Sequence, residues 1–198
     1  MAAFALPAPL RRLAVLLLPL WLAACGVNTI PTLEEEVNAA WAQVQNQYQR
    51  RADLVPNLVE TVKGFAAQER QVLTEVTEAR ARATAIQLTP EIVNDPEAFR
   101  RFQEAQAQLS GALGRLLAVS EAYPELRSNQ NFLNLQSQLE GTENRIAVAR
   151  RDYIQAVQRF NTEIRTFPGR LWNWMHGAEP KQNFQADAAA QQAPQVKF

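Results

Sequence analysis

The sequence is poor in cysteine and histidine and has no excess of positive charge. It contains 1 cysteine and 1 histidine, so it can form no internal disulfide and offers no cluster of soft metal ligands. Its 20 lysine and arginine residues are balanced by 20 aspartate and glutamate residues, which leaves no net charge to attract a polyanion. We therefore expect no metal, no cofactor and no nucleic-acid partner.

Glycine is also scarce, with 7 in 198 residues. The sequence has neither a glycine-rich phosphate loop nor the Gly-x-Ser-x-Gly turn that carries a hydrolase nucleophile. We also find no pair of residues in the sequence that suggests a nucleophile with a matching general base. We therefore expect no catalytic residue and interpret the protein as a non-enzyme.

The first part of the chain has the pattern of an export signal. Arg11 and Arg12 precede the apolar run 13–22, and the segment Leu22–Cys25 resembles a bacterial lipobox. The apolar run is about half as long as the roughly 20 residues that a membrane-spanning helix needs. We predict that residues 1–24 are a lipoprotein signal peptide and that Cys25 is acylated, for example with palmitate. Residues 25–32 would then form a tether.

The residue after the cysteine bears on the location of the protein. It is Gly26 rather than an aspartate, which by analogy with lipoprotein sorting in Gram-negative bacteria favours the periplasmic side of the outer membrane. The alternative is that the longer stretch 13–30 stays uncleaved as an inner-membrane span. In both interpretations the membrane is a partner of the N-terminus.

Three long stretches carry apolar residues at alternating steps of three and four, which is the spacing of one helix face. They are residues 33–86, 96–122 and 128–167, and the last would form a helix about 60 Å long. The first contains Pro56, where we predict a kink or a brief break. Short connections make such helices antiparallel neighbours. The sequence therefore predicts an all-α fold, an elongated antiparallel bundle of three to four long helices with coiled-coil-like spacing.

Two charged residues interrupt the apolar face of the first stretch. Arg51 lies near the expected kink, and we expect its side chain to reach the solvent. Glu69 lies between apolar positions, so we expect it to be partly buried. A buried carboxylate needs a partner, and Arg145 or Arg150 of the long helix could supply it.

Several ordered blocks of sequence extend from the first stretch to the end of the last. The blocks are Arg50–Gly64, Glu69, Thr77–Arg80, Tyr123–Leu126, Thr142–Ala147, Ala149–Arg151, Tyr153, Phe160–Asn161 and Phe167–Pro168. Together they resemble the LemA family of bacterial membrane-anchored proteins over about residues 34–198. The resemblance implies a helical protein with an N-terminal anchor and most of its chain outside the cytoplasm. It implies no catalytic residue, because the biochemical role of the family is not established. One departure is Ile154, where the family usually has asparagine.

The blocks also contain many polar residues beside the apolar faces. These are Arg50, Asp53, Asn57, Glu60, Glu69, Glu143, Asn144, Arg145, Arg150, Arg151 and Asn161. One interpretation is a network between helices that fixes their register. The other is a polar face that docks a partner protein.

Residues 168–198 form a C-terminal tail that leaves the predicted bundle. Its aromatic stretch, Leu171–Met175, suits packing against the end of the bundle. The alternative is an anchor in the membrane interface, where tryptophan is enriched.

These features predict a membrane-anchored extracytoplasmic protein that serves as a scaffold or partner-binding module for other envelope proteins. A long bundle on a tether provides reach and a long helical face for such contacts. The alternatives are an enzyme, such as a hydrolase acting on envelope material, and a structural protein that associates with itself.

Overall fold

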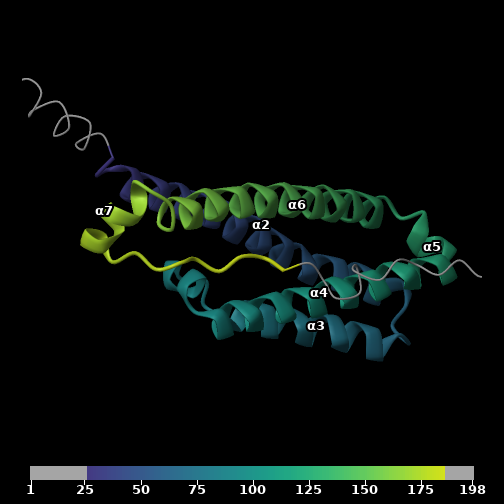
Figure 1. Cartoon of the computed structure of the whole chain (residues 1–198). Helices are drawn as coiled ribbons and strands as arrows, with labels where there is room; N and C mark the ends of the chain where they lie inside the picture. Colours follow the sequence, from purple (N-terminus) through teal and green to yellow (C-terminus); the bar gives the residue numbers. More distant parts are fainter. Residues whose placement is uncertain (1–25, 186–198) are drawn as a thin grey trace, which may run out of the picture.

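The computed structural model describes residues 26–185, which form the predicted elongated all-α bundle and contain no strand (Figure 1). The long helices of this part are α2 (Thr29–Phe65), α3 (Arg70–Ala85), α4 (Pro96–Ala122) and α6 (Gln130–Glu163). The short helices are η1 (Pro90–Asn94), α5 (Pro124–Arg127) and α7 (Gly169–His176). The long helices run alternately in opposite directions, as the short connections predict.

The pair α2 and α6 forms the long axis of the molecule. These helices have 37 and 34 residues, so they are about 55 and 51 Å long, and they pack side by side in opposite directions. The shorter α3 and α4 form a hairpin that lies along the second half of α2. Beyond α7 the chain turns back as an extended segment, residues 177–185, that runs along the bundle.

The core consists of two hydrophobic clusters, one in each half of the bundle. The first joins the first half of α2 to η1, the start of α4 and the second half of α6. The second joins the rest of α2 to α3, the rest of α4, α5 and the first half of α6. Trp41 is central to the first cluster, with its ring 5.4 Å from the rings of both Phe102 and Tyr153.

Side chains cap the N-termini of both α4 and α6. The Asp95 carboxylate accepts hydrogen bonds from the backbone N–H groups of Glu97 and Ala98, at 2.9 and 3.1 Å. The Asn129 side chain accepts one from the N–H of Phe132 at 3.1 Å. Both caps satisfy donors that the first turn of a helix cannot use internally.

Of the two alternatives predicted at Pro56, the brief break is wrong, because α2 continues through this residue to Phe65, and the kink stays a prediction. Core residues on both sides of the proline, among them Val55 and Leu58, hold the helix together. The chain instead reverses at residues 66–69, and α3 folds back along α2. The start of α2 also differs from the prediction, since residues 29–32 belong to this helix and not to a tether. The burial of Ile30 in the first cluster explains this earlier start.

A contact from α3 compensates for the missing N–H of Pro56. In a regular helix that N–H would donate to the carbonyl of Ala52, four residues earlier. Here the Nε atom of Arg80 donates to the Ala52 carbonyl at 2.8 Å. Arg80 therefore joins α3 to α2 at the one turn of α2 where proline leaves an acceptor free.

We predict that the cost of removing Arg80 depends on Pro56. The substitution Arg80→Met should lower the free energy of unfolding by about 1–3 kcal/mol, because the partly buried Ala52 carbonyl loses its donor. In a Pro56→Ala background the restored N–H takes over, so the same substitution should cost less. Urea unfolding of the four proteins measures this coupling. Equal costs in both backgrounds would show that Arg80 does not act through the carbonyl.

Candidate functional site

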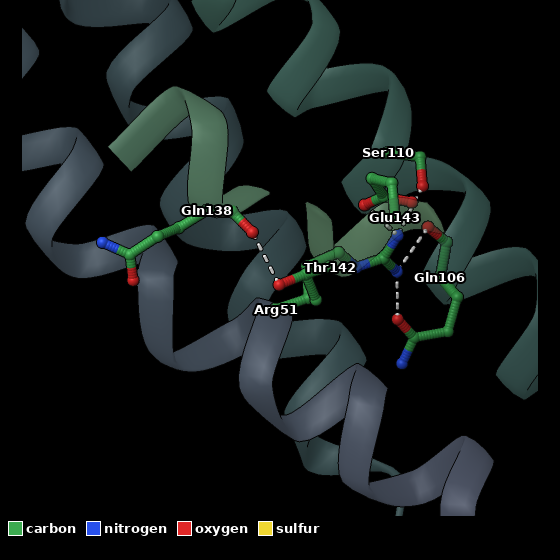
Figure 2. Close-up of polar contacts among 6 residues, drawn as sticks. All are labelled: Arg51, Gln106, Ser110, Gln138, Thr142 and Glu143. Carbon is green, nitrogen blue, oxygen red and sulfur yellow. Dashed lines mark hydrogen bonds and ion pairs between the residues drawn. The ribbon is translucent and has the colours of Figure 1, made fainter. Parts of the chain in front are cut away.

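A polar layer separates the two hydrophobic clusters, with Arg51, Gln106 and Thr142 buried and with Ser110 and Glu143 nearer the solvent. Its centre is Arg51 of α2, whose guanidinium lies between α4 and α6 (Figure 2). Its Nη1 atom donates to Ser110 Oγ at 2.7 Å and to Glu143 Oε1 at 3.1 Å. Its Nη2 atom donates to the side-chain oxygen of Gln106 at 2.5 Å and to the backbone carbonyl of that residue at 3.3 Å. One side chain thus joins three helices.

The charge of Arg51 is held in an environment that is almost free of solvent. The residue is 1% exposed, whereas the side chain of Glu143, its ion-pair partner, is 42% exposed. The guanidinium also lies over the ring of Tyr48, with its carbon atom 4.9 Å from the ring centre. Burial of such a charge is tolerated only when acceptors surround it. This layer supplies acceptors to both Nη atoms, whereas the buried Nε atom has no hydrogen-bond partner among the described residues.

The prediction that Arg51 reaches the solvent is therefore wrong. The positions on either side of it along the inner face of α2 are buried in the two clusters, so its side chain points into the bundle. Its partners on α4, Gln106 and Ser110, were missed because no local pattern connects them to α2. The sequence nevertheless contained a signal, because Arg51, Gln106 and Thr142 are polar residues at positions that belong to the apolar helix faces. The structure shows that all three are buried.

A small cavity of about 170 Å³ adjoins the layer and is lined by Tyr48, Glu143, Arg150 and Phe184, among others. Burial raises the pKa of Tyr48, and the nearby guanidinium groups of Arg150 and Arg51 oppose this rise. The cavity thus combines two cations, one carboxylate and a phenol that stays protonated at neutral pH. Within residues 26–185, no group of three or more histidine, cysteine or acidic side chains is arranged to hold a metal ion.

Glu69 is partly buried as predicted, but its partner is not an arginine of α6. Its carboxylate accepts a hydrogen bond from the hydroxyl of Tyr123 at 2.8 Å. This bond, rather than burial, is the main reason why the pKa of Tyr123 is raised. The prediction of Arg145 or Arg150 fails because the reversal at residues 66–69 places Glu69 next to the end of α4.

Asn161 and Arg150 hold the extended tail segment against α6. The Asn161 amide donates to the Lys181 carbonyl and accepts from the Lys181 N–H, both at 2.9 Å. The Arg150 guanidinium lies 4.5 Å from the centre of the Phe184 ring. The tail therefore packs along the side of the bundle, and the hydroxyl of Tyr153 fixes it further by donating to the Gln182 carbonyl at 2.7 Å. Burial raises the pKa of Tyr153.

The other predicted polar residues are exposed. These are Arg50, Asp53, Asn57 and Glu60 on α2, and Asn144, Arg145 and Arg151 on α6. Arg145 still joins the two helices, since its Nε atom donates to Gln47 of α2 at 3.3 Å. The predicted set thus divides into an inner group that joins elements of the fold and an outer group that faces the solvent. Cys25, with the signal peptide before it, and the tail after residue 185 lie outside the described residues.

Comparison with known proteins identifies the family. The model of the LemA family matches residues 40–198, which is most of the chain and includes the polar layer. The chain belongs to the LemA family.

The individual relatives named below share less than 30% sequence identity with this LemA-family protein. Magnetosome protein MamQ 2 of Paramagnetospirillum magneticum is 28% identical over 164 residues, which cover 75% of this chain and 59% of the relative. Protein LemA of Metamycoplasma hominis is 22% identical over 140 residues, which cover 71% of this chain and 60% of the relative. The chain thus spans about three fifths of the length of these curated relatives. The family and the relatives indicate a membrane-associated helical protein.

No helix within residues 26–185 has the length and the hydropathy that crossing a bilayer requires.

We predict that Arg51→Met destabilises this LemA-family protein by on the order of 3 kcal/mol. The substitution leaves buried Gln106 without its charged partner and removes the link between three helices. The matched control is Arg50→Met, which removes a neighbouring but exposed arginine and should change stability little. Urea unfolding compares the two variants. Equal stability of both variants would contradict a structural role for the layer.

Proposed function

We propose that this LemA-family protein is a lipoprotein, acylated at Cys25, on the periplasmic side of the outer membrane. In this proposal its bundle is a non-enzymatic scaffold that binds other envelope proteins through an outer face of α2. The inner polar residues give the scaffold a fixed shape, and the outer ones contact the partner.

The main support is the outer polar stripe of α2, which we define as Arg50, Asp53, Asn57 and Glu60. Steps of three and four place these residues on one face of the helix, and all are exposed. The contacts of its carboxylates stay within α2: Asp53 accepts from Gln49, and Glu60 pairs with Lys63. Such exposed contacts contribute little to stability. The stripe lies in a block that carries the family resemblance, yet the fold does not depend on it, so contact with a partner accounts for it better.

The shape of the bundle also suits a scaffold. The pair α2 and α6 offers a helical surface about 50 Å long, and a partner can bind along it. The polar layer at Arg51 and the tail bonds of Asn161 restrain this surface, so a partner would meet a preformed face with little ordering cost.

The first test concerns the anchor. Mass spectrometry of the mature protein, purified from cell membranes, should find an acylated Cys25 at the N-terminus, and density-gradient fractionation should place it with the outer membrane. Cys25→Ala should leave the chain unacylated, because the only acceptor thiol is lost. A peptide from the cellular protein that crosses the Ala24–Cys25 bond would contradict acylation and support an uncleaved inner-membrane span.

The second test concerns the outer polar stripe. A variant with Arg50→Ala, Asp53→Ala and Asn57→Ala should keep its melting temperature within a few degrees, because all three side chains are exposed. Pull-down after crosslinking in intact cells should lose the partner that the unaltered protein captures.

The matched control changes an exposed ion pair elsewhere, Arg100→Ala with Glu104→Ala on α4, which should not affect capture. Capture that persists in the stripe variant would refute docking at this face. Capture of only further copies of the same chain would point to a self-assembling structural protein instead.

A further inference from the structure

One end of the bundle carries a concentrated apolar surface. Phe167 is 86% exposed, and on α7 Leu171, Trp174 and Met175 are 57%, 84% and 65% exposed. The other large apolar side chains that are exposed in the described part are single residues with lower exposure, between 38% and 47%. A cluster of exposed apolar side chains of this kind marks a site of interaction.

The fold fixes the direction in which α7 presents this surface. Leu171, Trp174 and Met175 share one face of the helix, whereas Trp172 on the other side packs against the first hydrophobic cluster. At Gly169 a Cβ atom would lie 2.2 Å from the backbone carbonyl of Glu163, so only glycine allows α7 to start this close to the end of α6. The contacts of Gly169 and Trp172 therefore fix the position of α7 and of its exposed apolar face.

The same helix holds the segment that directly follows Cys25. A Cβ atom on Gly26 would lie 2.6 Å from the Nε1 atom of Trp172. The Nε2 atom of His176 lies 3.1 Å from the carbonyl oxygen of Val27, within hydrogen-bonding distance. The start of α2 and α7 thus occupy the same end of the bundle (Figure 1). Gly26, the residue that follows the predicted acylation site in the sequence, thus lies against α7.

We propose that Phe167, Leu171, Trp174 and Met175 form a membrane-facing platform that inserts into the interfacial region of the bilayer that holds the N-terminus. This inference rests on the proposed anchoring at Cys25. Tryptophan prefers the membrane interface, and amphipathic helices bury their apolar faces there by about 5–10 Å. The exposed cations Arg165 and Arg170 flank the platform and can contact lipid phosphate groups.

The experiment measures the depth of Trp174 in the membrane. The full-length chain is expressed and its mature form purified from membranes. It is then reconstituted into vesicles of phosphatidylethanolamine and phosphatidylglycerol, with and without phosphatidylcholine brominated in its acyl chains. Bromine quenches a nearby tryptophan, so we expect quenching that Trp174→Phe largely removes. The matched control, Trp174→Phe with Phe65→Trp, moves the tryptophan to the exposed position at the other end of α2, where we expect no quenching.

Flotation of the same samples distinguishes failure of this inference from failure of the proposed function. Protein that floats with the vesicles while Trp174 is not quenched would overturn the platform and leave the lipid anchor intact. Equal quenching at residues 65 and 174 would also overturn it, because the bundle would then lie flat on the bilayer. Unacylated protein that does not float would overturn the proposed anchoring, and the platform with it.

Discussion

The rest of the structure depends on the burial of one charge, the guanidinium of Arg51. Taking such a group out of water costs several kcal/mol unless acceptors and a counter-charge replace the lost hydration. Gln106, Ser110 and Glu143 provide that replacement for the two Nη atoms from two other helices, and the Nε atom has no partner among the described residues. Apolar helix faces can slide by a turn and still pack, but these acceptors meet Arg51 in only one register. We therefore expect the polar layer to specify the register of α2, α4 and α6, a role that single buried polar residues have in coiled coils.

The irregular parts of the fold are held in a related way, by side chains that bond to backbone groups of another element. Arg80 of α3 supplies the donor that Pro56 removes from α2. Asn161 of α6 bonds to both the N–H and the carbonyl of Lys181 in the extended tail. An extended segment with no strand beside it leaves backbone groups without regular partners, and this contact satisfies two of them. Polar side chains thus help to hold the tail against the bundle, whereas apolar side chains hold the long helices together.

The sequence allowed correct prediction of the features that follow local rules. The all-α class and the helices α4 and α6 follow from residue spacing. Of the kink or brief break predicted at Pro56, the break does not occur, because a donor from another helix and a core on both sides outweigh the local cost of proline. The partner of Glu69 could not be predicted, since it depends on the reversal at residues 66–69. The partners of Arg51 could not be predicted, since they lie on helices far away in the sequence. The docked tail has no periodic pattern to reveal it.

The proposed platform and the outer polar stripe of α2 together define a geometry for the scaffold. Arg50 is the first residue of the stripe and lies 21 positions after Thr29, the first residue of α2. At about 1.5 Å per residue, a platform seated on the bilayer would hold the stripe at least about 30 Å along the helix from that end. This distance exceeds the depth of the lipid headgroups, so the stripe would meet proteins and not lipid. In this proposal the inner polar residues keep the bundle rigid and the apolar end orients it on the bilayer. The outer polar residues would then lie where a partner in the envelope can reach them.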